Sequence, residues 1–172
     1  MWKYFILACL QLLLALLLAV GVTYLTFRLF QYFWFKRAGV PTDNISSATL
    51  LSAGLLSVAY ILSGVIQPLL NVIRTIESTA KTYTELILRT LQYLVLFVGL
   101  GLLIAFLVNV IGLYLFTQLT QKIDELEEIR KDNRAVGLLT GAIIIVLALF
   151  LKDSAVNLLE ALIPYPNIPF RN

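Results

Sequence analysis

Residues 90–121 read TLQYLVLFVGLGLLIAFLVNVIGLYLFTQLTQ and contain no Asp, Glu, Lys or Arg. The hydrocarbon core of a bilayer is about 30 Å thick, and an α-helix crosses it with roughly 20 apolar residues. This run is long enough to cross on its own, and it has too little polar surface for a helix of a small soluble domain. It therefore predicts a transmembrane helix.

Three further apolar runs have the same character. Residues 5–27 and 45–73 carry no charge, and the uncharged run 135–151 continues, more polar, to residue 163. A soluble chain of 172 residues could not bury four such helices. The first run exceeds the roughly 7–15 residues of a signal-peptide core and has no small-residue cleavage pattern after it, so we interpret it as a retained helix. The predicted fold is all-α, a four-helix transmembrane bundle.

The overall composition points the same way. The chain is 60% apolar and only 13% charged, whereas soluble domains are about 25% charged. Its net charge is +3 and it has no histidine. Lys and Arg occur singly or in pairs between apolar runs, which is typical of membrane-flanking residues and not of a nucleic-acid interface. The predicted environment is the lipid bilayer.

The sequence gives no sign of an enzyme. It lacks both GxxxxGK[ST] and GxGxxG, and its single cysteine, Cys9, has no cysteine or histidine partner for a disulfide or a metal site. The acidic run at Asp124, Glu125, Glu127 and Glu128 lacks the ligand spacing of an EF-hand and has basic neighbours. It predicts a solvated helical extension. We expect no cofactor, no metal and no catalytic residue.

The connections between the apolar runs differ. Residues 32–44 predict a short loop that ends in a helix-start signal, Pro41-Thr42-Asp43. The charges in residues 74–89 recur every three or four positions, which predicts helical extensions of the flanking spans. Residues 121–134 form the most charged loop, and the proline-rich tail 163–169 predicts an extended, interfacial segment.

The two halves of the chain match in pattern when the sequence is shifted by 89 residues. The matched pairs are Asn44 with Asn133, Ala48 with Gly137, and Ser52 with Gly141. We interpret 1–83 and 84–172 as two copies of a helical hairpin that enter the membrane from the same side, together forming one membrane domain.

Small residues predict where the two copies meet. Gly137 and Gly141 lie one turn apart on a single helix face, and Ala48 and Ser52 are the matched small residues of the second helix. Small side chains let two helix backbones approach closely in a membrane. This predicts packing of the second helix against the fourth at the centre of the fold. A contact between two copies of the chain remains the alternative.

The segment EEIRKDNRAVGLLTGA, residues 127–142, resembles the signature of the bacterial inner-membrane family catalogued as domain of unknown function 350. In that family an acidic stretch and Lys-Gly-Asn precede a glycine-containing helix. PTDNISSA, residues 41–48, resembles a weaker first copy, and Asp132 stands where the family usually has Gly. The resemblance implies a duplicated hairpin in the bacterial inner membrane, associated with envelope stress, and no established reaction.

A few polar residues near the predicted spans are candidate functional groups. Arg28, Lys36 and Arg37 predict anchors at the membrane interface, because long basic side chains can reach the headgroups. Lys152 and Asp153 follow 17 uncharged residues, about 25 Å of helix.

Two interpretations of this second group remain open. With Glu160 on a similar face, Lys152 and Asp153 form either an ion or proton site or a set of headgroup anchors. Asn109, like Gln92 and Gln11, could bond across helices or contribute to a polar site.

We favour a membrane scaffold or assembly subunit that displays its charged loops to a membrane or soluble partner protein. The alternative is a small oligomeric channel or transporter, and a lipid-modifying enzyme is the least favoured. Loops 32–44 and 121–134 are predicted on one side of the membrane with both termini on the other. A modest excess of Lys and Arg places these loops in the cytoplasm.

Overall fold

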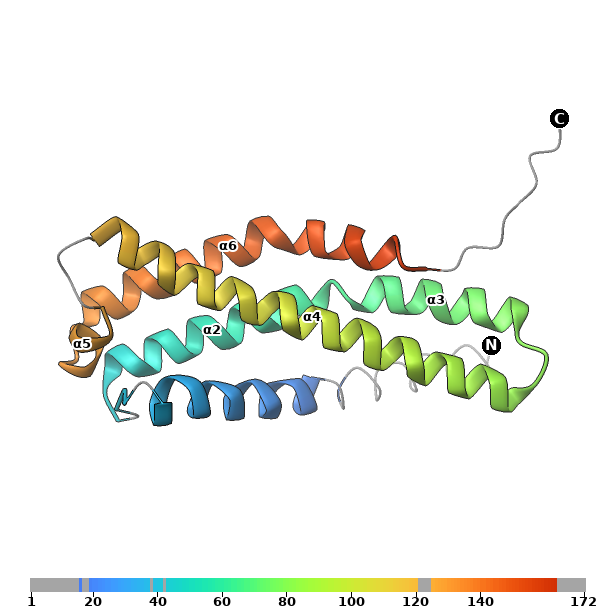
Figure 1. Cartoon of the computed structure of the whole chain (residues 1–172), viewed down its shortest axis with the longest axis horizontal. Helices are drawn as coiled ribbons and strands as arrows, with labels where there is room; N and C mark the ends of the chain where they lie inside the picture. Colours follow the sequence, from blue (N-terminus) through green and yellow to red (C-terminus); the bar gives the residue numbers. More distant parts are fainter. Residues whose placement is uncertain (1–15, 17–18, 38, 42, 121–124, 164–172) are drawn as a thin grey trace, which may run out of the picture.

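The computed structural model is an elongated, all-α bundle (Figure 1). The structure describes residues 16, 19–37, 39–41, 43–120 and 125–163. Residues 19–30 are α-helical and continue directly into a π-helix, η1 (Gln31–Arg37). The remaining helices are α2 (Ile45–Ser63), α3 (Ile66–Thr79), α4 (Tyr83–Thr120), α5 (Glu125–Arg130) and α6 (Arg134–Glu160).

Three stretches of the described chain are long and apolar enough to cross a membrane. They are Ile45–Thr79, Tyr83–Leu119 and Arg134–Glu160. The helix composition therefore confirms the prediction of a multi-pass membrane protein. Most of the predicted first span, 5–27, lies outside the described residues, and its part from residue 19 onward is helical. The tail 164–172 and residues 121–124 also lie outside them.

The first connection is shorter than predicted. A loop was expected over 32–44, but the helix continues through η1 to Arg37. Packing explains the extension, because the Phe33 ring lies against Phe106 of α4 with 5.4 Å between ring centroids. Tertiary contact thus outweighs the modest helix propensity of aromatic residues.

The predicted run 45–73 is divided between α2 and α3. At the break, the amides of Gly64 and Val65 donate to the carbonyls of Ile61 and Leu62, three residues back, at 3.0 Å each. Pro68 has no N–H, so it cannot continue the helical ladder to the carbonyl of Gly64. The helix therefore tightens here and restarts as α3.

The second connection is a hairpin turn between α3 and α4. Residues 74–79 and 83–89 are helical, which confirms the predicted extension of the flanking helices. Glu85 and Arg89 form an i,i+4 ion pair of 2.6 Å. The buried face of α3, including Val72, packs with Phe97 and Leu159 in a core cluster at this end of the bundle.

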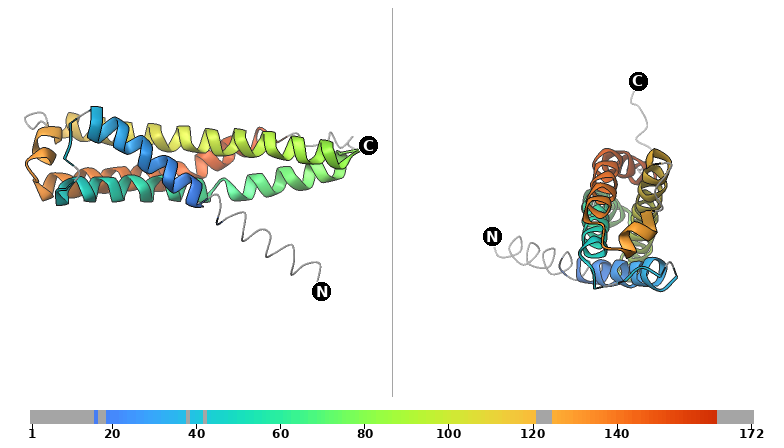
Figure 2. Two further views of the ribbon diagram at one scale, coloured as in Figure 1. Left: turned by 90° about the horizontal axis from the view of Figure 1, so that it is seen from below. Right: turned by 90° about the vertical axis from the view of Figure 1, so that its left-hand side faces the viewer.

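Among the described helices the most extensive contact is between α2 and α6, which lie side by side in both views of Figure 2. A Cβ placed on Gly137 would lie 2.8 Å from the Ser46 carbonyl oxygen, and one on Gly141 would lie 2.9 Å from the Ala53 Cβ. The two glycines thus allow close backbone approach within one chain.

The α2 side of this contact differs from the expected pair. Ala48 and Ser52 are both exposed, and Ser46 and Ala53 face α6 instead. Successive helical residues are about 100° apart, so Ala48 lies about 200° from Ser46, on the other side of α2. Shifting the chain by 89 residues aligned the small residues but did not give their facing direction.

Candidate functional site

One end of the bundle is closed by a hydrogen-bonded junction between segments more than eighty residues apart (Figure 1). The side-chain amide of Asn44 donates to the carbonyl oxygen of Ile129 in α5 at 2.7 Å. The Oδ1 of the same side chain accepts from the amide of Ser47 at 2.7 Å and caps α2. Asn44 therefore caps α2 and also ties α5 to the start of α2.

The turn between α5 and α6 supplies the reciprocal bonds. Asp132 Oδ1 accepts from the amide of Ser46 at 2.8 Å, and Ser46 Oγ donates to the carbonyl of Asn133 at 3.0 Å. Asp132 thus satisfies a first-turn amide of α2, which no intrahelical carbonyl can reach. We define the junction as Asn44, Ser46, Glu128, Asp132 and Asn133.

The charges of α5 are fixed by the same junction. The side-chain amide of Asn133 donates to Glu128 Oε2 at 2.7 Å. This bond, aided by Lys131, lowers the pKa of the Glu128 carboxyl. Lys131 Nζ lies 2.8 Å from a Glu127 oxygen, and this contact raises the pKa of the ammonium group. Both side chains therefore stay charged at neutral pH.

The predicted interface anchors lie along the helix that ends in η1. Arg28 is exposed, its Nε donates to the Tyr24 hydroxyl at 3.2 Å, and its guanidinium carbon lies 5.6 Å from the Tyr24 ring centroid. It lies nine residues before Arg37, the last residue of η1, and so deeper than the position predicted from a loop at 32. Arg28 and Lys36 line an open groove of about 720 Å³ with Gln31, Tyr32, Val40, Pro41 and Asp43.

Asn109 lies fully buried in the middle of the bundle. Its amide nitrogen donates to the Ala105 carbonyl at 2.8 Å and to Ser57 Oγ of α2 at 3.4 Å. Its Oδ1 has no partner among the described residues and faces Gly54. The arrangement is a hydrogen bond between helices with one oxygen left unused. Gln92 is exposed, and Gln11 lies outside the described residues.

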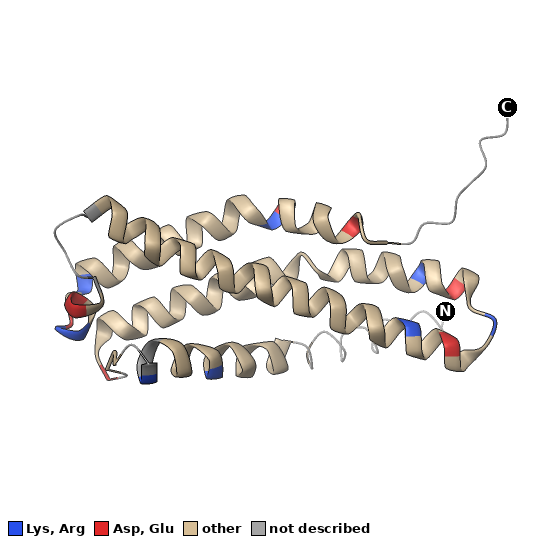
Figure 3. Ribbon diagram, in the orientation of Figure 1, with Lys and Arg blue, Asp and Glu red and all other residues tan. Residues whose placement is uncertain are grey.

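The predicted group on α6 is not brought together. In the described part of the chain, Lys152, Asp153 and Glu160 form no ion pair with one another. Lys152 is half-buried and its Nζ lies 4.4 Å from the centroid of the Tyr60 ring, whereas Asp153 is exposed. Figure 3 shows these charges on α6 well away from the charged end at α5.

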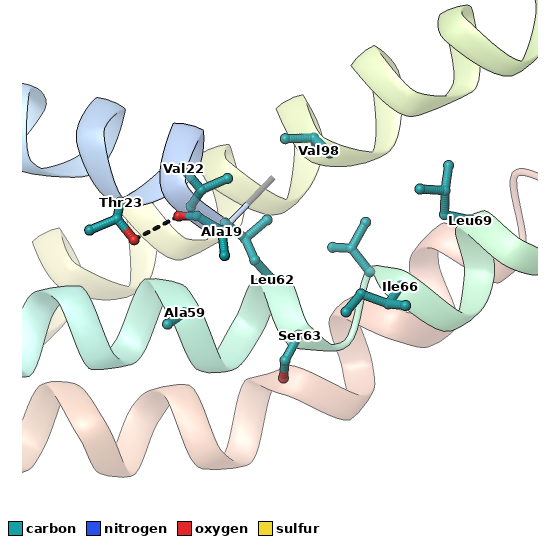
Figure 4. Close-up of a pocket in the computed structure, with 10 residues that line it drawn as sticks. Ala19, Val22, Thr23, Ala59, Leu62, Ser63, Ile66, Leu69 and Val98 are labelled. Carbon is teal, nitrogen blue, oxygen red and sulfur yellow. Dashed lines mark hydrogen bonds between the residues drawn. The ribbon is translucent and has the colours of Figure 1, made fainter. Parts of the chain in front are cut away.

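An apolar cavity of about 210 Å³ lies beside the α2–α3 break (Figure 4). It is lined by Ala19, Val22, Thr23, Ala59, Leu62, Ser63, Val65, Ile66, Leu69 and Val98. The Thr23 hydroxyl donates to the Ala19 carbonyl at 2.7 Å, and the described residues that line the cavity include no titratable side chain. Within the described ranges no three His, Cys, Asp or Glu side chains are placed to hold a metal ion.

Comparison with known families identifies the chain. The model of the family described as Domain of Unknown Function (DUF350) matches residues 1–155. The chain belongs to this family. No curated protein and no solved structure matches it. The resemblance drawn from residues 127–142 is thereby confirmed.

The family pattern acquires a structural reason at one position. Asp132, which stands where DUF350 members usually have Gly, has a φ of 59°. Glycine adopts this left-handed conformation without strain, and Asp and Asn tolerate it better than other residues. Here Asp132 also supplies the bond to Ser46. The departure from the family pattern was the one sequence signal that could have drawn attention to this residue.

Proposed function

We propose that this DUF350 protein is a membrane scaffold or assembly subunit that presents the α5 end of its bundle to a partner protein. The observation that carries the proposal is the junction, which holds a charged helix rigidly against two membrane helices. A docking surface benefits from such preorganisation, because less conformational freedom is lost when the partner binds.

The outward face of α5 has the composition of a recognition surface. Ile129, fully buried, anchors the helix to the bundle, while Glu127 of the helix and Lys131 of the turn directly after it are exposed. Fixed charges of both signs favour a partner with a complementary pattern and disfavour others. We propose a location in the bacterial inner membrane with the loops 32–44 and 121–134 in the cytoplasm, which the Lys and Arg bias favours, so the proposed partner is a cytoplasmic or membrane protein.

The proposed architecture includes two features beyond the three described spans. Residues 5–27 form a fourth span, and 1–83 and 84–172 are duplicated hairpins. Asn44 and Asn133 support the duplication, because each occupies the N-cap position of the helix that follows it.

A small oligomeric channel is the second candidate, and the observation that favours it is the buried Oδ1 of Asn109, which has no hydrogen-bond partner among the described residues. Two features weigh against a path through one chain. Asn109 is fully buried inside the bundle, so its side chain reaches no open path. The Phe30 ring also lies against Gly54, next to the Asn109 oxygen. A channel would therefore need another surface, shared between copies of the chain.

Site-specific photo-crosslinking in cells tests the scaffold. A photoreactive residue replaces Glu127 of α5 or Lys131 in the turn that follows it, and the matched control replaces Leu138, which is 64% exposed on the first turns of α6. We expect a discrete protein adduct from the α5 positions and none from Leu138. Equal adduct patterns at all three positions would overturn the proposal.

A second measurement separates the two candidates. Purified protein reconstituted in liposomes should give no ion flux above that of empty liposomes if it is a scaffold. Selective flux that is lost in Asn109→Leu, with the α5 positions giving no discrete adduct, would favour the channel.

A further inference from the structure

A second hollow lies on the outer surface between α2 and α6. It has a volume of about 400 Å³ and is lined by Leu56, Ser57, Ala59, Tyr60, Ser63, Ile145, Ala148 and Leu149. These residues are mostly apolar, and the α2 part runs from Leu56 to Ser63, about 10 Å at 1.5 Å per residue. A hollow of this character on a membrane helix pair suits a hydrocarbon chain.

The cation of Lys152 lies next to this hollow, over the ring of its lining residue Tyr60. Lys152 follows Leu149 by three positions, so both lie on one face of α6. Its stem crosses Gly64, where a Cβ would lie 3.3 Å from the lysine Cε, and its Nζ lies over the Tyr60 ring at 4.4 Å. Because Gly64 has no side chain, the Lys152 side chain can pack against the α2–α3 break at this position.

The ammonium group has no acidic partner in the described part of the chain, since no carboxylate lies within 4.0 Å of it. Its neighbour Asp153 is exposed and lies about 100° around the helix. The contact with Tyr60 uses one side of the ammonium group and leaves N–H donors for an anion.

The position of Lys152 along α6 matches the depth of a headgroup. Arg134, at the first residue of α6, has a 70% exposed side chain. Lys152 lies 18 residues further, about 27 Å, which is close to the 30 Å thickness of the hydrocarbon core. When Arg134 lies at one face of the membrane, Lys152 lies at the other, and the hollow runs from Lys152 toward the middle of the bilayer.

We propose that Lys152, Tyr60 and the hollow between α2 and α6 form a binding site for one anionic phospholipid. The phosphate binds the Lys152 ammonium group beside the Tyr60 ring, and one acyl chain lies between Leu56 and Leu149. The Ser63 hydroxyl lines the hollow but donates its hydrogen to the Tyr60 carbonyl at 2.6 Å, so it can only accept a hydrogen bond from the lipid. The Ser63 hydroxyl points to the α6 side of α2 (Figure 4). This site is independent of the partner surface on α5.

Native mass spectrometry of the detergent-purified full chain tests the site with two probes, phosphatidylglycerol and phosphatidylcholine of the same acyl chains. The variants are Lys152→Gln, Lys152→Arg, and Lys81→Gln as a control in the exposed α3–α4 turn. One interfacial lysine contributes about 1 kcal/mol toward an anionic lipid, so Lys152→Gln should weaken phosphatidylglycerol binding about fivefold. Lys152→Arg and Lys81→Gln should stay near wild type.

Thermal unfolding of the same variants in phosphatidylcholine shows whether Lys152→Gln is folded, and equal melting temperatures are expected. Wild-type protein that binds both lipids equally would overturn the proposal, because Lys152 would then give no preference for the anionic headgroup. Equal loss in Lys152→Gln and Lys81→Gln would overturn it as well, since net charge alone would explain the effect.

Discussion

The contact between Gly137 and Ser46 makes the sharpest prediction. In Gly137→Ala the new methyl group would overlap Ser46 Oγ and would lie 2.8 Å from the Ser46 carbonyl oxygen and 3.0 Å from its Cα. Because two of these atoms are backbone, a rotamer change cannot relieve the overlap, and α6 must move away from α2. Overpacking of this kind costs about 1–3 kcal/mol.

The same movement strains the junction. Ser46 makes two of its hydrogen bonds, to Asp132 at 2.8 Å and to Asn133 at 3.0 Å. Losing each costs about 0.5–1.5 kcal/mol. The expected destabilisation of Gly137→Ala is therefore about 2–6 kcal/mol in the free energy of unfolding. Ser46→Gly in the same chain removes the overlap with Oγ but not with the backbone, so it should not restore stability.

The control is Gly99→Ala in α4, where nothing lies within 4 Å of the added methyl group. It should be neutral or stabilising by up to about 1 kcal/mol, the usual gain from replacing an exposed helical glycine. Equilibrium unfolding in mixed detergent micelles, followed by circular dichroism, measures both variants. If Gly137→Ala is as stable as Gly99→Ala, the α2–α6 contact does not stabilise the fold as argued.

The junction gives three more predictions, measured by unfolding under the same conditions. Asp132→Ala should be less stable than Asp132→Gly by about 1–2 kcal/mol, since alanine keeps the left-handed strain and both lose the carboxylate; equal stability would contradict this. Asn44→Ala should lose about 1 kcal/mol for the cap and a further 0.5–1.5 kcal/mol for the bond to Ile129, whereas Asn44→Asp keeps the cap and should lose only the second part. The pKa of the Glu128 carboxyl lies below its ordinary value of 4.5. The stability that this carboxylate adds to the folded state is therefore present above pH 4.5 and is lost as the pH falls through the lowered pKa. The loss of unfolding free energy at acid pH should be smaller in Glu128→Gln than in the wild type. An equal loss in both would show that the Asn133 bond to Glu128 is not the source of the acid dependence.

The sequence predicted the helices well because lipid solvation imposes long uncharged runs, and such runs are visible without any knowledge of packing. Its small residues also predicted that the second and fourth helices of the bundle, α2 and α6, pack against each other, which the structure shows. It missed the break after Ser63, although Gly64 and Pro68 were both present, because the uncharged run continues through them. It also missed the extension through η1, which depends on Phe33 meeting Phe106 across 73 positions of chain.

The junction was harder to predict for a different reason. Its Asn residues were noticed as matched positions, but the bond from Ser46 to Asp132 depends on the relative rotation of α2 and the α5–α6 turn. A shift of 89 residues contains no information on that rotation. The unusual Asp at a glycine position hinted at a special backbone there, and only the three-dimensional arrangement shows what the carboxylate binds.

The Asp132 bond also constrains how the chain is assembled during synthesis. The amide of Ser46 at the start of α2 is paired only when the ribosome has added residue 132, after α4 has been made. Until then the first turn of α2 must use water or headgroups as hydrogen-bond acceptors. Contacts so distant in sequence form late. The start of α2 is therefore incomplete until the α5–α6 turn has been made, and that turn supplies the missing acceptor. The bond that holds the charged end against α2 thus forms only after residue 132 has been added to the chain.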